Sequence, residues 1–324
     1  MSDQLIQFVR DYFKTLEFIP LHAPVFPGRE KEYVADTIES TFVSSVGAYV
    51  DRFEKDMASY TGSSKAVATV NGTAALHISL KLAGVEAGDL VITQPLTFVA
   101  TCNAIAYCNA EPVFIDVDRE TLGLSAKALE AWLEENAKLD TEGVCRTRAD
   151  NKVVRACVPM HTFGHPADLD GLISVTHRWN ISLVEDAAES LGSFYKGKHT
   201  GTFGTLGTLS FNGNKIMTTG GGGMILAGGA LAARAKHLTT TAKKPHAYEY
   251  IHDELGYNYR LPNLNAALGC AQLEQLETFI GAKRALAAAY EDFFSGTNQE
   301  FVREPADCRS NYWLNAVICE DKAH

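Results

Sequence analysis

The chain has 324 residues, a formal net charge of −10 and 46% hydrophobic residues. This length predicts about two domains with an ample core, and the negative charge argues against general nucleic-acid binding, which needs a basic surface. No run of about eighteen apolar residues exists, so we expect no membrane span. Seven cysteines at irregular spacings predict neither a disulfide framework nor a zinc site. We therefore expect a cytoplasmic protein.

Strand-like and helical segments alternate along the chain. The N-terminal residues 1–18 have the spacing of a short amphipathic helix and lack the apolar core of a signal peptide. Further helices are expected at 30–42, 73–82, 98–107, 125–136 and 168–178. Strands are expected at 66–70, 90–93, 113–117, 153–159, 181–186, 208–211 and 224–227. This alternation predicts an α/β fold in which helices cover both faces of a mostly parallel, seven-stranded sheet.

The pattern changes near residue 256. Residues 261–286 have the spacing of a long or broken helix, with Gly281 as the expected break, and a strand is expected at 311–319. We expect a large domain over residues 1–255 and a small C-terminal α/β domain over residues 256–324.

Lys215 lies between a polar strand-like run and four glycines, in the segment GTLGTLSFNGNKIMTTGGGG (204–223). Lysine forms Schiff bases with carbonyl groups, and pyridoxal phosphate (PLP) is the usual carbonyl cofactor. A solvated surface charge is the alternative. The glycines 220–223 favour a tight turn, because glycine tolerates positive φ; a phosphate cradle is the other interpretation.

A carboxylate ends one of the expected strands. The apolar run 181–184 leads into Glu185 and Asp186, and the carboxyl end of a buried parallel strand is where α/β sheets bind ligands. The pyridine nitrogen of PLP needs an acid to stay protonated. Asp186 could instead cap a following helix, and the two roles are compatible.

Residues 67–82 have the pattern strand, tight turn, helix. The turn is Asn71–Gly72–Thr73, so the backbone N–H groups of Gly72, Thr73 and Ala74 are expected to point out of a helix N-terminus. Such an end binds anions, including phosphate.

Together these segments resemble the DegT/DnrJ/EryC1/StrS family of PLP-dependent aminotransferases, which act on nucleotide-linked keto sugars. The resemblance runs from about Ile19 to the end of the chain, and its motifs come in the family's order. They are PLHAPVFPGREKEYV (20–34), GAYVDRFEKDMASYTG (47–62), NGTAAL (71–76), TFVATCNA (97–104), PMHTFGHPAD (159–168), EDAAES (185–190), SFNGNK (210–215) and GYNYRLPNLNAALG (256–269). The resemblance implies the PLP-dependent transferase fold of aspartate aminotransferase type (fold type I).

The resemblance also implies roles for single residues. Lys215 would form the Schiff base and Asp186 would pair with the pyridine nitrogen; both would be catalytic. The cofactor-binding set would be Gly72, Thr73, Ala74, Phe98 (stacked on the ring), Asp186, Glu189, Ser210, Lys215 and, from a second subunit, Asn258. Substrate contacts would come from His161, Asn212, Lys243, Tyr259 and Arg260. No metal is expected, because Gly164 and Pro166 interrupt any helix that could pair His161 with His165.

Three features depart from the family pattern. Asn212 stands where the family often has histidine, and Glu189 stands where it often has glutamine. Family members usually continue for some tens of residues past the segment 311–321, so the small domain is expected to be incomplete here. Lys243, Lys244 and His246 form either a solvated loop or a contact to a nucleotide diphosphate.

The activity implied is transfer of an amino group from L-glutamate to C4 of a nucleotide-linked 4-keto-6-deoxy (2-acetamido) hexose, by a homodimer with shared active sites. The phrase SFNGNKIMTTGGGG looks most like the LegC-like subgroup of nonulosonic (legionaminic) acid pathways; the nucleotide could be UDP or GDP. Three alternatives stay open. They are a sugar dehydratase, which Lys215 disfavours; an amino-acid decarboxylase or lyase using Arg260 or Arg303; and a PLP-binding dimer without turnover.

Overall fold

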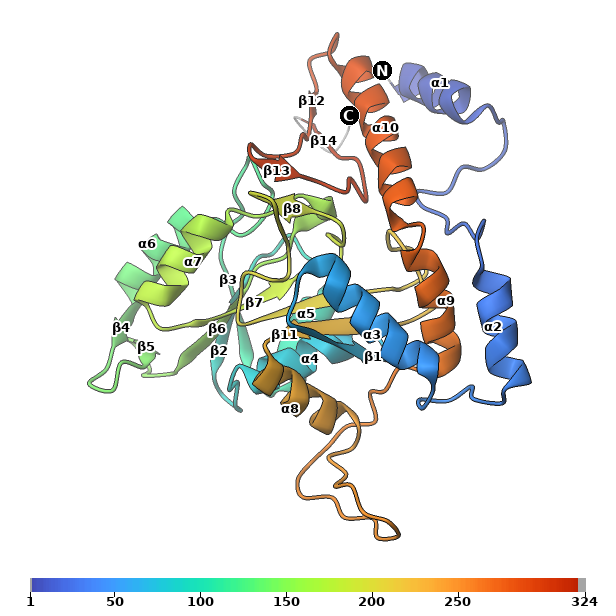
Figure 1. Cartoon of the computed structure of the whole chain (residues 1–324). Coiled ribbons are helices and arrows are strands. Elements are labelled where there is room, and N and C mark those ends of the chain that lie inside the picture. Colours follow the sequence, from blue (N-terminus) through green and yellow to red (C-terminus); the bar gives the residue numbers. More distant parts are fainter. Residues whose placement is uncertain (1, 320–324) are drawn as a thin grey trace.

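A computed structural model describes residues 2–319 of the chain (Figure 1). Its central sheet contains β1 (Lys65–Thr69), β2 (Leu90–Thr93), β3 (Glu111–Phe114), β6 (Val154–Val158), β7 (Ser182–Asp186), β10 (Leu206–Ser210) and β11 (Gly223–Ala227). The strand order is β1-β11-β10-β7-β6-β2-β3. All pairings from β10 to β3 are parallel, and β11 runs antiparallel to both β1 and β10. The expected mostly parallel seven-stranded sheet is therefore confirmed.

Helices cover both faces of this sheet, as Figure 1 shows. The helices of the described chain are α1 (Ser2–Phe13), α2 (Glu30–Glu39), α3 (Ala48–Thr61), α4 (Gly72–Leu82), α5 (Val99–Tyr107), α6 (Ala126–Asn136), α7 (Leu169–Arg178), α8 (Gly229–Thr239), α9 (Asn263–Leu273) and α10 (Leu276–Phe294). The shorter elements are β4 (Ala137–Leu139), β5 (Cys145–Thr147), a 3₁₀ turn (Thr162–Gly164), β8 (Phe194–Tyr195), β9 (Lys198–His199), β12 (Glu300–Phe301), β13 (Cys308–Arg309) and β14 (Val317–Ile318). None of the helices within residues 2–319 is long and apolar enough to cross a membrane.

Successive residues of each strand face opposite layers, because side chains alternate along a strand. In β1, Val67 joins the apolar cluster under α4, α5 and α8, whereas Ala66 and Ala68 join the cluster under α3 and α9. Helices α6 and α7 bury a third cluster on β2, β6 and β7. Burial on both faces explains why these strands read as continuous apolar runs in the sequence.

The C-terminal elements differ from the sequence prediction. The helix predicted over 261–286 is broken at Glu274 and Gln275, between α9 and α10, and Gly281 lies inside α10. The glycine was therefore the wrong break. The strand predicted over 311–319 is reduced to β14, Val317–Ile318. Helices α3 and α8 had not been predicted.

The chain segment 14–29, here called the strap, connects α1 to α2 without regular structure. Helix α1 is held against α10 by aromatic contacts: Phe8 stacks on Phe293 with ring centroids 4.7 Å apart and meets the edge of Tyr290 at 5.2 Å. The strap thus runs back along α10 toward the sheet (Figure 1). The strap lies beside the loop that carries Lys215 and shares a cavity with it.

Candidate active site

A cavity of about 340 Å³ lies at the carboxyl ends of β1, β7 and β10. Most of the sequence-predicted cofactor residues share it. Those that line it are Gly72, Thr73, Phe98, Asp186, Glu189, Ser210 and Lys215. Asn212, predicted as a substrate contact, lines it as well. These residues come from segments spread over more than a hundred positions of sequence, and the ends of neighbouring strands bring them together.

Lys215 places its amine inside this cavity. The side chain is 12% exposed, and Nζ lies 3.5 Å from Oε1 of Glu189. It also lies 4.0 Å from the centre of the Trp313 ring, a cation–π distance. The indole Nε1 of Trp313 donates to the carbonyl of Asn214 at 2.6 Å, so the same side chain supports the loop that carries the lysine.

Asp186 ends β7 and is 6% exposed. Thr101 Oγ1 donates to Asp186 Oδ2 at 2.8 Å, and the Ala188 N–H donates to Oδ1 at 3.2 Å. Each oxygen keeps acceptor capacity for a group in the cavity, since an ionised carboxylate can accept about four bonds. No helix begins in residues 187–192, so the helix-cap interpretation of Asp186 was wrong.

The turn before α4 offers two free amides rather than the three predicted. Asn71 is the N-cap, and its Oδ1 accepts from the Ala74 N–H at 2.7 Å. The amides of Gly72 and Thr73 are the first in the helix and have no intrahelical acceptor. The Ala74 amide is already hydrogen-bonded to Asn71, so the prediction that it binds phosphate was wrong. A Cβ on Gly72 would lie 2.8 Å from Cβ of Ser210, so only glycine lets the turn approach this serine.

Glu189 is a buried acid facing the lysine. Its Oε2 accepts from the Phe163 N–H at 2.8 Å, while Oε1 faces Lys215. Burial raises the pKa of Glu189, and the nearby Lys215 charge only partly offsets this effect. Glu189 can therefore stay protonated at a pH at which an exposed glutamate is ionised.

We expect Glu189→Gln to raise the free energy of unfolding of the cofactor-free protein relative to wild type, by a margin that grows with pH. A glutamate whose pKa is higher in the folded state stabilises the fold at a pH below its unfolded-state pKa of about 4.3. This stabilisation is lost as the pH rises through the pKa of the folded state. Glutamine does not titrate, so it avoids that loss. Urea unfolding of both proteins at pH 5 and pH 8 measures the margin; a margin that is constant or smaller at pH 8 would contradict this assignment.

The histidines of the 159–168 motif lie in the core rather than at the cavity. His161 is fully buried; its Nε2 lies 3.1 Å from Glu185, and Nδ1 accepts from the Ala167 N–H at 3.1 Å. The prediction of a substrate contact by His161 is corrected accordingly, because its ring holds the loop to β7. His165 is also fully buried, packs edge-on against Tyr312 at 5.1 Å, and has its pKa lowered to about 4 by burial.

Three predicted substrate residues, Lys243, Tyr259 and Arg260, lie outside the cofactor cavity of their own chain, and so does Asn258, which was predicted to bind the cofactor of a second subunit. Lys243 and Arg260 line a separate, largely basic cavity of about 460 Å³, together with Lys236, Lys244 and His246. Tyr259 stacks on a neighbouring tyrosine and reaches His77 at 3.3 Å. Asn258 accepts from Arg260 Nε at 3.0 Å and does not line its own cofactor cavity.

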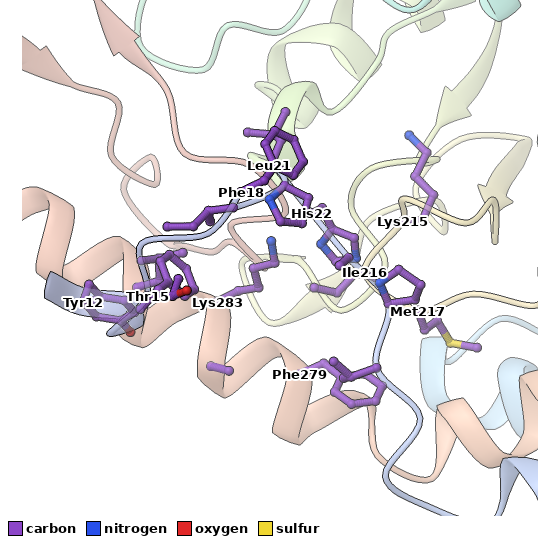
Figure 2. Close-up of a pocket in the computed structure, with 18 of the residues that line it drawn as sticks. Tyr12, Thr15, Phe18, Leu21, His22, Lys215, Ile216, Met217, Phe279 and Lys283 are labelled. Carbon is purple, nitrogen blue, oxygen red and sulfur yellow. The ribbon is translucent and has the colours of Figure 1, made fainter. Parts of the chain in front are cut away.

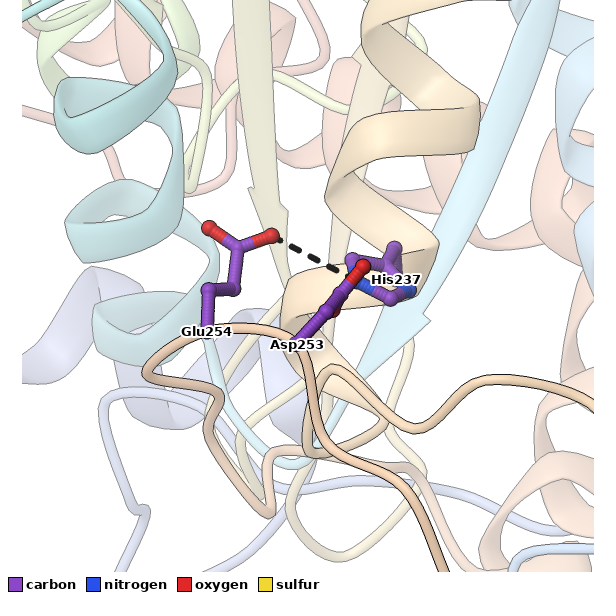
Figure 3. A group of neighbouring side chains, drawn as sticks. All are labelled: His237, Asp253 and Glu254. Carbon is purple, nitrogen blue, oxygen red and sulfur yellow. Dashed lines mark hydrogen bonds and ion pairs between the residues drawn. The ribbon is translucent and has the colours of Figure 1, made fainter.

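One side-chain group has metal-like composition within residues 2–319: His237, Asp253 and Glu254, whose ligand atoms lie within 4.8 Å of one another (Figure 3). Cations already engage both carboxylates. Arg234 pairs with Glu254, and Lys244 lies 3.5 Å from Asp253. We interpret the group as an ion-pair network that fastens the loop after α8 to that helix.

Sequence reasoning missed several cavity residues. Trp313, Thr101, Met160, Asn71 and Asn214 all line the cavity. Asn71 carried a usable signal, because asparagine before a helical run is a preferred N-cap. Trp313 carried none, since its contact to the lysine depends on where the C-terminal segment folds back.

The cavity therefore combines a buried lysine amine, a carboxylate at the end of a parallel strand, an aromatic ring at Phe98 and a helix N-terminus with free amides. These groups fit PLP: they match its carbonyl, its ring nitrogen, its ring face and its phosphate respectively. The fold and site define a PLP-dependent enzyme of fold type I.

Comparison with known proteins gives the family. The DegT/DnrJ/EryC1/StrS aminotransferase family matches residues 27–324. The chain is 37% identical to GDP-perosamine synthase of Escherichia coli O157:H7, over 94% of this chain and 78% of that protein. It is 38% identical to the putative pyridoxal phosphate-dependent aminotransferase EpsN of Bacillus subtilis (strain 168), over 94% and 76%. The crystal structure of the aminotransferase TlmJ from Streptoalloteichus hindustanus matches with a TM-score of 0.82 and 29% identity, over 93% of this chain and 78% of that one. The chain belongs to the DegT/DnrJ/EryC1/StrS family and is a PLP-dependent aminotransferase.

Proposed function

We propose that this enzyme moves an amino group from L-glutamate to C4 of a nucleotide-linked 4-keto-6-deoxy hexose. The observation that carries the proposal is the position of the Lys215 amine, buried beside Glu189 and Trp313 in the cavity that Asp186 also lines. The similarity to an enzyme named GDP-perosamine synthase supports a nucleotide-linked sugar as the acceptor and favours a GDP-linked one.

Bound PLP supplies a carbonyl for attachment to an amine and a ring that accepts the electrons released when a proton leaves the substrate carbon. Lys215 would hold the cofactor, and its amine, when free, would carry that proton. An amine suits this task because it can both accept and release a proton. Glu189, at 3.5 Å from Nζ, is placed to stabilise the charged amine between the two steps.

The remaining cavity residues orient the reactants. Asp186 holds the ring nitrogen in its protonated state, and Thr101 fixes the carboxylate by its 2.8 Å hydrogen bond. Phe98 lies at the cavity mouth, 67% exposed, where it is available to stack on the ring. The Gly72 and Thr73 amides and the Ser210 hydroxyl would bind the phosphate.

The active unit in this proposal is a homodimer in which Asn258 of each chain completes the site of the other. Two observations support it: Asn258 lies outside its own cavity, and large apolar side chains on α5 and the loop after α8 are exposed. These are Phe98, Val99, Tyr107, Tyr248, Tyr250 and Leu255. In the same arrangement, the basic cavity at Lys243 and Arg260 would bind the nucleotide diphosphate.

The alternative of an amino-acid decarboxylase or lyase is less well supported. Such an enzyme needs an arginine for the substrate carboxylate, and neither candidate lines the cofactor cavity. Arg260 bonds to Asn258, and Arg303 pairs with Glu291 on the surface.

Product analysis tests the substrate assignment. The PLP-loaded protein is incubated with L-glutamate and, in parallel, with GDP-linked 4-keto-6-deoxymannose or UDP-linked 2-acetamido-4-keto-6-deoxy hexose, and products are measured by mass spectrometry. The proposal predicts an amino sugar and an equal amount of 2-oxoglutarate. Product only from the UDP-linked acetamido sugar would favour the nonulosonic acid branch over the GDP branch. Release of carbon dioxide from amino acids, with no amino sugar, would refute sugar amination.

A further inference from the structure

A second cavity, of about 500 Å³, lies on the other side of the lysine loop (Figure 2). We call it the strap cavity. The end of α1 and the strap form one wall, α10 forms the opposite wall, and residues 215–217 form the floor. Of the residues that the structure describes, Lys215 alone lines both this cavity and the cofactor cavity. The volume of the strap cavity is typical of small-molecule binding sites.

The lining of the strap cavity is mostly apolar. Figure 2 shows Phe18 and Leu21 of the strap facing Phe279 of α10 across Ile216 and Met217. Among residues 2–319, the charged side chains of the lining are two lysines, Lys215 and Lys283, and no carboxylate. The chain as a whole has a net charge of −10, whereas the described lining of this cavity is positively charged.

Lys283 supplies the cation of this cavity. In Figure 2 its amine points toward Phe18 and His22 of the strap, whereas the Lys215 amine points away toward the cofactor side. Burial lowers the pKa of Lys283 to about 8, with no carboxylate to offset the lost hydration. Burial and, to a smaller extent, the Lys283 charge together lower the pKa of His22 to about 4, so His22 is neutral beside the lysine at neutral pH.

We propose that the strap cavity binds a small ligand that combines an apolar ring or chain with one anionic group, which pairs with Lys283. The apolar body would displace water from the aromatic and aliphatic walls, and the anion would replace the hydration that Lys283 lost on burial. Gln272, at the cavity wall, is not available to the ligand through its amide nitrogen, which donates to Val25 O at 2.9 Å and Glu30 Oε1 at 2.7 Å. Recognition therefore depends on Lys283 and on the apolar walls. This site adjoins the proposed aminotransferase site and shares the backbone of the lysine loop with it, but its ligand contacts and its test do not depend on turnover.

The test uses two fluorescent probes that share an N-phenylnaphthylamine framework: the anionic 8-anilinonaphthalene-1-sulfonate and the neutral N-phenyl-1-naphthylamine. Each is titrated into the PLP-saturated protein. Lys283→Met keeps an unbranched side chain of nearly the same length and removes its charge. We expect this variant to bind the anionic probe at least about tenfold more weakly, and the neutral probe within about twofold of wild type. Lys65→Met, at an exposed lysine of β1, is the matched control and should bind both probes like wild type. Phe279→Ala should weaken both probes.

Three outcomes would overturn the proposal. The first is that Lys283→Met binds the anionic probe as tightly as wild type does. The second is that Lys283→Met and Lys65→Met weaken it equally. The third is that neither probe binds wild type, which would indicate that protein rather than a small ligand fills the cavity. Circular dichroism of each variant establishes that a loss of binding is not a loss of fold.

Discussion

Lys215→Ala is expected to abolish aminotransferase activity, with a loss of at least about a thousandfold in turnover. The variant lacks the amine that attaches the cofactor and moves the proton. Its fold should persist, because the lysine lies in a loop and contributes one cation–π contact and one ion pair, together worth on the order of 1 kcal/mol. Turnover, and absorbance of PLP-incubated protein at roughly 410–430 nm, where lysine-bound PLP absorbs, are the two measurements.

Lys65→Ala is the matched control for this variant, since it removes an exposed lysine on β1 and should leave both readouts unchanged. Transamination at the wild-type rate by Lys215→Ala would refute the assigned mechanism. Loss of the circular dichroism signal would show instead that the loop supports the fold.

Asp186→Asn is expected to retain PLP but to lose about 100- to 1000-fold in turnover. Asparagine has the same shape, and its Oδ1 can still accept the hydrogen bond that Thr101 donates at 2.8 Å in wild type. It carries no negative charge, so it no longer favours the protonated ring nitrogen. We therefore expect a large loss of turnover and only a small change in the dissociation constant of PLP.

The matched control for Asp186→Asn is Asp170→Asn, which neutralises an exposed aspartate paired with Lys196 on the surface and should not change the rate. An unchanged rate in Asp186→Asn would remove Asp186 from its role. An equal loss of rate in both variants would point to a general effect of charge.

The sequence was most informative where local pattern and tertiary environment agree. The strands of the sheet are apolar because both faces are buried, so β1, β2, β6 and β7 were found within a residue or two of their ends. Asp186 was predicted from its place at a strand end, Gly72 from a strand–turn–helix pattern, and Lys215 and Ser210 from the lysine segment and its family resemblance. The structure brings the four residues to one cavity, because strand ends in such a sheet lie along one edge.

Prediction failed where distant segments decide the outcome. The error at Ala74 is of another kind, because it is local: Ala74 looked like a phosphate ligand, but the N-cap Asn71, three residues earlier, occupies its amide. His161 looked like a loop residue near the substrate, but its partner is Glu185, buried in the next strand of the sheet. Trp313 reaches the lysine from a segment about a hundred residues away. The contacts of His161 and Trp313 leave no periodic signal in the sequence, because both depend on tertiary geometry.

The central claim is that Lys215 holds PLP and that the cofactor accepts an amino group from L-glutamate. Its most direct test is the absorbance spectrum of the purified protein with PLP, recorded before and after L-glutamate is added. We predict a band at roughly 410–430 nm that shifts toward about 330 nm with glutamate in wild type and is absent in Lys215→Ala. A wild-type band that persists unchanged with glutamate would contradict the proposed donor, and the absence of any band in wild type would contradict the cofactor site itself.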